Sequence, residues 1–140
     1  MFGTSSIRLL VIDDYEPWRR FVGTTFEKYP ELQIIGEASD GLEAVQKAQD
    51  LLPDLILMDI GLPRLGGIEA AVRIHQLVPS VKILFISQNS DADVVEAALS
   101  NGASGYLLKT EASRELLVAI NTVIRGETFI SERLRSQSSE

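Results

Sequence analysis

Five short apolar runs, each followed by a segment with helical periodicity, constrain the fold of this chain more than any other feature. The runs lie at residues 7–12, 33–37, 54–58, 81–86 and 104–108. Strands that alternate with helices in this way predict an α/β architecture with parallel strands. Strand-helix-strand connections are almost always right-handed, so helices should cover both faces of the sheet. We therefore expect a doubly wound five-stranded parallel sheet with five helices.

The helical segments carry their own start and stop signals. Asp40 and Glu43 have capping-box spacing before the second helix, Asp91 is placed to cap the fourth, and Ser113 and Gly126 bound the fifth. Gly66 and Gly67 open the third helix. In the first helix the apolar side chains repeat at three- and four-residue steps, which predicts a stripe that faces the core: Trp18, Phe21, Val22, Phe26 and Tyr29.

Polar residues follow four of the five apolar runs. Asp13 and Asp14 come after the first, Asp59 after the third, Ser87 after the fourth and Lys109 after the fifth. Residues that end parallel strands meet at the carboxyl edge of the sheet, where such folds bind ligands. Carboxylates are ligands that Mg²⁺ prefers, and one divalent ion with the Lys109 ammonium would cancel the charge of three ionised aspartates. The pattern predicts a metal-dependent site, with Asp59 as the central carboxylate and candidate nucleophile toward a phosphoryl group.

Each of these residues also has a structural interpretation. Asp14 could cap the first helix, and Asp59 could belong to a turn with Gly61 and Pro63. The joint occurrence of the acidic residues at successive strand ends favours the site. The single histidine, His75, lies in the third helix, far in sequence from every strand end, so we expect it on a solvated face and not in a phosphoryl relay.

Composition excludes several classes of function. A chain of 140 residues fits one domain, and a net charge of −7 opposes binding to DNA or to anionic lipid. No apolar stretch is long enough to cross a membrane, so we expect a cytoplasmic protein without a membrane partner. The absence of cysteine excludes thiolate metal sites. The chain becomes polar near its end, which predicts a domain over residues 1–130 and a polar tail or the start of a linker over 131–140.

The chain resembles the receiver domain of bacterial two-component response regulators from residue 7 to about residue 130. The matching stretches, in family order and spacing, are LLVIDDYEPWR, GEASDGLEAV, PDLILMDIGLPRLGGIEA, KILFIS and GASGYLLK. The phrases GEASDG, GASGYLLK and IRGETFIS are most similar to the NarL/LuxR-type subgroup. Members of that subgroup usually continue into a helix-turn-helix DNA-binding domain, which this chain does not contain. The resemblance implies a flavodoxin-like (CheY-like) sheet with strand order 2-1-3-4-5.

The resemblance assigns phosphoryl chemistry to the strand-end residues. Asp59 would be the phosphoacceptor, and Lys109 would contact the phosphoryl group. Asp13, Asp14, Asp59 and the backbone carbonyl of Gly61 would hold Mg²⁺. The chain would then be a switch and not an enzyme, with self-phosphorylation from small phosphodonors and slow autodephosphorylation as its only catalysis.

The resemblance also assigns the switch and its partners. Ser87 occupies the hydroxyl switch position and Tyr106 the aromatic one, and on phosphorylation Ser87 would move inward and Tyr106 would follow it. The responding surface would be the expected fourth helix, fifth strand and fifth helix, from Asp91 to Arg125. A sensor histidine kinase would be the phosphodonor, a homodimer could form on phosphorylation, and DNA would be bound only through the missing output domain.

Two residues depart from the usual receiver pattern, and two more occupy variable positions. Gly66 stands where many members carry Asp or Asn, and Thr110 where many carry a proline in a cis bond. Gly61 and Asn89 flank the site at positions that affect the lifetime of the phosphoryl group.

Other functions stay open at this point. A receiver without an output domain could act through protein contacts alone. A Mg²⁺-dependent phosphatase or phosphotransferase could use the same carboxylates on small molecules, and an FMN-binding module could share the sheet topology. Against FMN, the first strand-helix loop is acidic and lacks a phosphate-cradling glycine.

Overall fold

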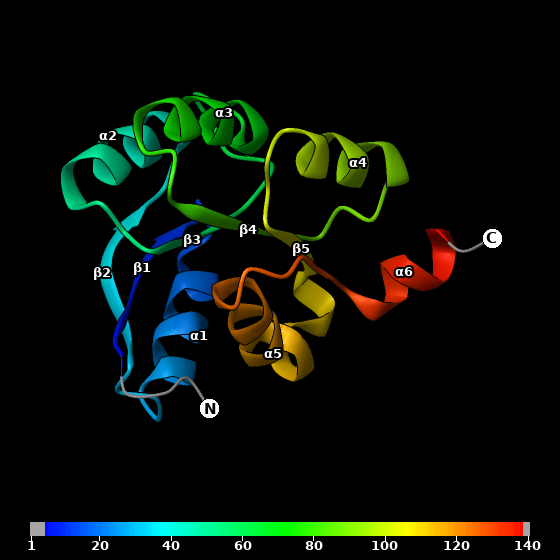
Figure 1. Ribbon diagram of the computed structural model, residues 1–140, viewed down its shortest axis with the longest axis horizontal. Coiled ribbons are helices and arrows are strands. Elements are labelled where there is room, and N and C mark those ends of the chain that lie inside the picture. The colour runs from blue at the N-terminus through cyan, green and yellow to red at the C-terminus, as the bar shows by residue number, and fades with distance from the viewer. Residues whose placement is uncertain (1–4, 139–140) are drawn as a thin grey trace.

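Parallel strands form the centre of the molecule (Figure 1), and their apolar side chains pack on both faces of the sheet. The computed structural model describes residues 5–138. The sheet has the order β2-β1-β3-β4-β5-β6, and every neighbouring pair is parallel. The strands are β1 (Ile7–Ile12), β2 (Leu32–Ala38), β3 (Leu55–Met58), β4 (Lys82–Ser87), β5 (Gly105–Leu108) and β6 (Phe129–Ile130). The expected fold class and the order of the first five strands are confirmed.

Alternation along the strands divides the core into two layers. Leu9 and Val11 of β1 pack on one face of the sheet, and Leu10 and Ile12 pack on the other. Both faces are covered, which explains why the strands are nearly continuous apolar runs. The helices α2 (Gly41–Leu51), α3 (Gly67–Leu77) and α4 (Ala92–Ser100) cover one face, and α1 (Glu16–Phe26) and α5 (Ala112–Ile124) cover the other (Figure 1).

Most of the predicted helix signals act as expected. Asp40 Oδ1 accepts the backbone N–H of Glu43 at 2.8 Å, and Asp91 Oδ1 caps α4 by accepting the backbone N–H of Asp93 at 2.8 Å. Helix α5 begins one residue before Ser113, which therefore does not cap it. None of the helices within residues 5–138 has the length and apolar character needed to cross a membrane.

The predicted core stripe of the first helix is only partly correct. Val22 and Phe26 are buried, and Trp18 is partly buried against the same layer. Phe21 is 38% exposed, and Tyr29 lies beyond the end of α1 although it still packs against this layer. Phe21 lies at the margin of this layer, where its ring packs against Trp18 and borders a cavity that Lys109 also lines.

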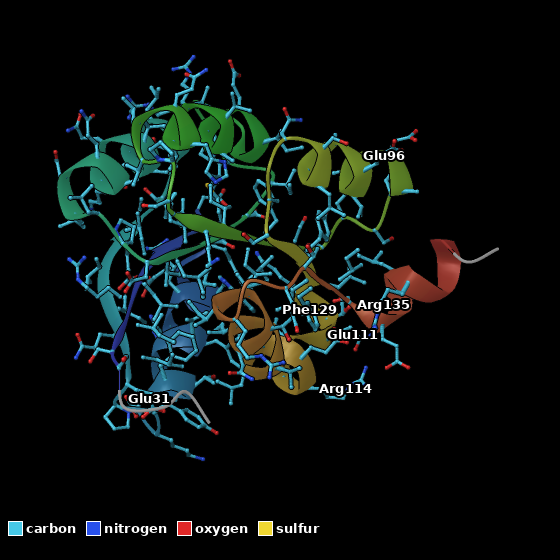
Figure 2. All side chains as sticks on the ribbon, viewed as in Figure 1. Glu31, Glu96, Glu111, Arg114, Phe129 and Arg135 are labelled. Carbon is cyan, nitrogen blue, oxygen red and sulfur yellow. The ribbon has the colours of Figure 1, made fainter. Side chains whose placement is uncertain are left out.

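The C-terminal edge of the sheet differs from the prediction of five strands and five helices. Strand β6 adds to the edge of β5, and helix α6 (Glu132–Ser138) follows it. Phe129 packs in the same layer as α5 (Figure 2), and Leu134 of α6 is buried in the layer on the opposite face. A strand of two residues has no measurable periodicity, so the sequence pattern could not reveal it. Residues 131–134 are therefore part of the packed structure, and the domain boundary at residue 130 stays a prediction.

Candidate functional site

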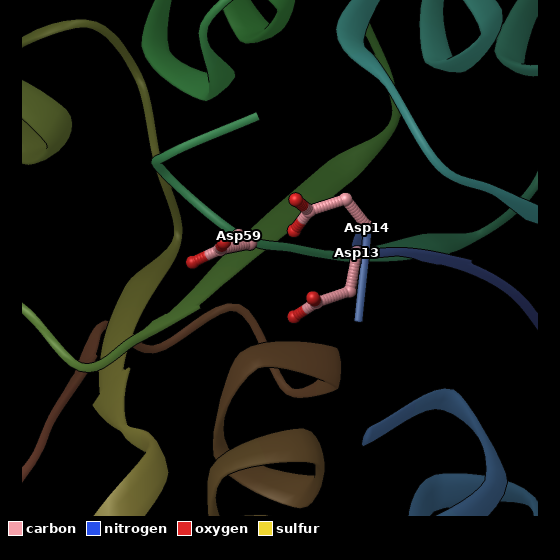
Figure 3. Close-up of side chains that lie close together, drawn as sticks. All are labelled: Asp13, Asp14 and Asp59. Atoms are coloured by element: carbon pink, nitrogen blue, oxygen red, sulfur yellow. The ribbon is translucent and has the colours of Figure 1, made fainter. Parts of the chain in front are cut away.

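The carboxyl ends of four adjacent strands bring the polar residues into one crevice. Asp13 follows β1, Asp59 follows β3, Ser87 ends β4 and Lys109 follows β5, and these strands are neighbours in the sheet. Carboxylate oxygens of Asp13, Asp14 and Asp59 lie within 4.8 Å of one another (Figure 3). Such a cluster is a candidate site for a cation with oxygen ligands.

Asp13 is the most deeply buried of the three carboxylates. Its side chain is 1% exposed, and its Oδ1 accepts the backbone N–H of Tyr15 at 2.9 Å. Its Oδ2 lies 2.6 Å from Lys109 Nζ in an ion pair whose geometry falls outside that of a hydrogen bond. Among the described side chains, Asp13 Oδ2 is thus a buried oxygen without a hydrogen-bond donor. A buried carboxylate oxygen with unused lone pairs suits a metal ion.

Asp59 occupies the centre of the crevice. Its backbone N–H donates to the carbonyl of Ile12 at 3.0 Å, which ties the end of β3 to the end of β1. Burial raises the pKa of the Asp59 carboxyl, and the charges of Asp13 and Asp14 act in the same direction, whereas the Lys109 ammonium lowers it. A cation in the crevice would oppose this rise by favouring the ionised form.

The structural alternative for Asp14, a cap on the first helix, has no support in the structure. Helix α1 begins after Tyr15, which makes no side-chain cap, and it is Asp13, not Asp14, whose oxygen accepts the Tyr15 N–H. Asp14 is exposed at the mouth of the crevice and does not cap the helix.

Helix α3 approaches the loop after Asp59 very closely. The Gly67 N–H donates to the carbonyl of Ile60 at 2.8 Å, and a Cβ at Gly67 would lie 2.2 Å from the carbonyl oxygen of Asp59. Gly67 is therefore required by contact with the site. Gly66 is different, because a Cβ there would have its nearest neighbour, Ile60 O, at 4.0 Å. The glycine that departs from the receiver pattern is not demanded by packing.

Ser87 and Tyr106 are connected through the backbone of one residue. Ser87 Oγ accepts the N–H of Asn89 at 3.0 Å, and the Tyr106 hydroxyl donates to the carbonyl of Asn89 at 2.7 Å. Tyr106 is fully buried, and burial raises the pKa of its hydroxyl. The resemblance implied that Tyr106 would move into the interior on phosphorylation, but its side chain is already buried in this structure. The bridging role of Asn89 was not predicted, because backbone groups leave no signal in side-chain types.

Lys109 enters the crevice from a short 3₁₀ turn, η1 (Lys109–Glu111), that leads directly into α5. No peptide bond among residues 5–138 is cis, so the segment around Thr110 differs from the loop that a cis proline forms. Besides Asp13, the ammonium faces the ring of Trp18, with Nζ 5.3 Å from the ring centroid. From the sequence, Trp18 was predicted only as a core residue. Its position one turn after the Asp13–Asp14 pair was the signal that could have placed it beside the site.

His75 lies away from this crevice, at the opposite edge of the sheet. Its Nε2 is 3.1 Å from the carbonyl oxygen of Val81, just before β4, and its ring also contacts the turn at Gly102. The expectation of a solvated face is therefore wrong in part, because the ring is half-buried against two neighbouring segments.

Comparisons with known proteins give the family. Residues 9–121 match the model of the response regulator receiver domain. The chain belongs to the response regulator receiver family. Receiver domains are in general phosphoacceptors and not enzymes, and they bind Mg²⁺ through acidic residues.

Individual relatives support the NarL/LuxR-type resemblance. The chain is 38% identical to the transcriptional regulatory protein LiaR of Bacillus subtilis (strain 168), over 91% of this chain and 61% of LiaR. It is 35% identical to the transcriptional regulatory protein DegU of Brevibacillus brevis, over 93% of this chain and 55% of DegU. A LuxR-family two-component response regulator from Aurantimonas sp. SI85-9A1 superimposes with a TM-score of 0.91 at 30% identity, covering 96% of both chains. The receiver thus spans less than two thirds of the two curated relatives.

Proposed function

We propose that this receiver accepts a phosphoryl group on Asp59 from a phosphohistidine of a sensor histidine kinase. An Asp59 carboxylate oxygen attacks phosphorus, the P–N bond breaks, and the imidazole leaves with the electron pair and takes up a proton. The observation that carries this proposal is the placement of Asp59. It lies in a cluster of carboxylates within 4.8 Å of one another and borders a cavity of about 240 Å³ that Ser87 and Lys109 also line.

The residues present fit a resident Mg²⁺. Asp13, Asp14, Asp59 and the carbonyl of Gly61 would hold it, and this assignment is supported by the buried Asp13 Oδ2, which has the Lys109 ammonium beside it but forms no hydrogen bond among the described residues. When bound, Mg²⁺ supplies positive charge beside the phosphoryl oxygens. Lys109, whose side chain is 13% exposed and pairs with Asp13 in this structure, would then pair with another phosphoryl oxygen.

Phosphorylation would switch the site through Ser87. The Ser87 hydroxyl, whose Oγ accepts the N–H of Asn89 in this structure, would turn to donate to a phosphoryl oxygen, and the Asn89 segment would move with it. Moving a two-state equilibrium from 1:99 to 99:1 requires about 5.5 kcal/mol. Two charge-assisted hydrogen bonds, from Ser87 and Lys109, contribute about 1.5 to 3 kcal/mol each, which approaches that value. Tyr106 is already buried, so its side chain would not move inward after Ser87. Its hydrogen bond to Asn89 would instead stabilise the switched state.

The surface formed by α4, β5 and α5 is the expected output of this change. Asn89 lies in the β4–α4 loop, so its movement shifts the start of α4. Amide hydrogen exchange within residues 91–125 should change on phosphorylation. Unchanged exchange throughout this segment would refute the proposed output surface.

The downstream function follows from the relatives. We propose that the receiver controls an attached DNA-binding output domain, as the names of LiaR and DegU as transcriptional regulatory proteins suggest. Homodimer formation on phosphorylation and a cytoplasmic location belong to the same proposal. A receiver that acts by protein contacts alone remains the alternative, and the length of the encoding reading frame distinguishes the two.

A small-molecule phosphatase is less well supported. The cavity beside Asp59, about 240 Å³, is smaller than the roughly 300–1,000 Å³ of typical small-molecule sites. Turnover of a phosphate ester far faster than autodephosphorylation would favour this second function over the switch.

The deciding experiment measures intact mass after incubation with acetyl phosphate and Mg²⁺. The wild type should gain one phosphoryl group, and neither Asp59→Asn nor the metal-free sample should gain any. A receiver that needs its kinase would bind Mg²⁺ without gaining mass, whereas a protein that does neither would refute the proposal.

A further inference from the structure

The Lys109 ammonium is held between a carboxylate and an aromatic ring. Nζ lies 2.6 Å from Asp13 Oδ2 and 5.3 Å from the ring centroid of Trp18. Trp18 is the only tryptophan of the chain and lies in the first turn of α1. The indole therefore forms one wall beside the ammonium that the proposed function requires.

The acidic loop at Asp13 helps to fix the position of Trp18. Arg19, its neighbour in α1, donates from its guanidinium to the carbonyl of Asp13 at 2.5 Å, which attaches the helix to the acidic loop. The indole also contacts Phe21, with ring centroids 5.2 Å apart and an interplanar angle of 33°. Helix α1 and the acidic loop together thus fix the position of the Trp18 ring.

An aromatic face is better suited than a second carboxylate to hold the Lys109 ammonium beside the crevice. A lysine side chain is long and has many rotamers, so an ammonium beside water alone would sample many positions. A ring face attracts the cation without neutralising it. The ammonium can therefore leave Asp13 for a phosphoryl oxygen while it stays near the ring, whereas a carboxylate would compete with the phosphoryl group.

We propose that Trp18 is a positioning residue for phosphoryl transfer, whose indole face holds the Lys109 ammonium beside the carboxylate crevice. This inference rests on the proposed function, because Lys109 meets a phosphoryl group only if Asp59 is the phosphoacceptor. Trp18 is not among the residues that line the cavity beside Asp59, so it would act through Lys109.

The first test compares Trp18→Leu, Trp18→Phe and Phe21→Leu with the wild type. The initial rate of phosphorylation by acetyl phosphate at saturating Mg²⁺ is measured by intact mass. Cation–π attraction of about 0.5 to 2 kcal/mol corresponds to a rate loss of about 2- to 30-fold if it acts fully in the transition state. We expect a loss of about three- to tenfold in Trp18→Leu, a smaller loss in Trp18→Phe, which keeps an aromatic face, and a rate within about twofold of wild type in Phe21→Leu.

The second test uses the fluorescence of the single indole. Lys109→Met removes the charge beside the ring and should change the emission of the metal-free protein. Lys28→Met, which removes an exposed lysine beyond α1, should not. This dependence tests whether the ammonium lies against the indole, which the positioning role requires, and an unchanged emission in Lys109→Met would overturn the proposal. This measurement also holds when Trp18→Leu fails to fold.

The outcomes separate the two proposals. A wild type that is phosphorylated, together with Trp18→Leu at the wild-type rate, overturns the positioning role and leaves the phosphoacceptor function intact. Equal rate losses in Trp18→Leu and Phe21→Leu also overturn it, because they indicate general packing. A wild type that is never phosphorylated overturns the proposed function and this inference together, even where the emission depends on Lys109.

Discussion

Replacing Ser131 by alanine should destabilise the edge of the sheet beside the site. Ser131 is fully buried where β6 ends and α6 begins. Its Oγ accepts the N–H of Leu108 at 2.9 Å and donates to Glu115 Oε1 at 2.7 Å, and its own N–H donates to the carbonyl of Tyr106 at 3.0 Å. This one residue therefore completes the hydrogen bonding of β5 on both sides of Leu107.

The structure gives the size of the effect. Alanine keeps the backbone bond to Tyr106 but removes Oγ, which leaves the buried N–H of Leu108 without an acceptor. A buried donor without a partner costs about 1 to 3 kcal/mol. The bond to Glu115 adds less, because Glu115 also accepts the N–H of Glu132 and is only half-buried. We expect the free energy of unfolding to fall by about 2 kcal/mol.

Thermal unfolding measures this loss. With an unfolding entropy of about 2.1 cal/mol/K per residue, a chain of this length has roughly 0.3 kcal/mol/K at its midpoint, so Tm should fall by about 7 °C. Ser113→Ala is the matched control, because Ser113 is exposed in α5 and its loss should change stability by less than about 0.5 kcal/mol.

Two results would refute this reasoning. Equal Tm values for Ser131→Ala and Ser113→Ala would show that the Leu108 N–H does not need Oγ. Unchanged hydrogen exchange at the Leu108 amide in Ser131→Ala would lead to the same conclusion, since a lost acceptor should speed its exchange.

The remaining predictions concern the glycines of the acidic crevice and its central carboxylate. Gly67→Ala should fail to fold or lose several kcal/mol of unfolding free energy, because its Cβ would lie 2.2 Å from the Asp59 carbonyl oxygen. Gly66→Asn should instead gain about 0.5 to 1 kcal/mol of unfolding free energy by capping α3. Chemical denaturation of both variants tests this pair, and equal losses would contradict it. In metal-free buffer, Asp59→Asn should raise Tm at pH 7. Burial raises the folded pKa of Asp59 above its ordinary value of 3.8, so the wild type loses stability as pH rises from that value through the raised pKa, and the difference should vanish below about pH 3.8. Added Mg²⁺ should stabilise the wild type more than Asp59→Asn, and a Tm difference that is independent of both pH and Mg²⁺ would contradict the assignment.

The alternation of apolar runs and helical segments was sufficient to predict the architecture. Strands buried on both faces are continuous apolar runs, and local signals such as the capping box at Asp40 and Glu43 set helix starts independently of distant contacts. The same pattern predicted that Asp13, Asp59, Ser87 and Lys109 would meet, because parallel strands end at one edge. These features depend on periodicity and chain direction, which are written locally in the sequence.

Contacts between distant segments were decided by the tertiary structure alone. The ring of Trp18 beside Lys109, the buried Tyr106 hydroxyl on the Asn89 carbonyl and the Ser131 bonds to β5 each join residues 16 or more positions apart, and no local pattern encodes such pairings. The sequence by itself determined which elements form and which polar residues end the strands, because propensity and periodicity act within a few residues. Only the packed structure decided which atoms of those residues touch, because that depends on how α1, α5 and the β6–α6 segment settle against the sheet.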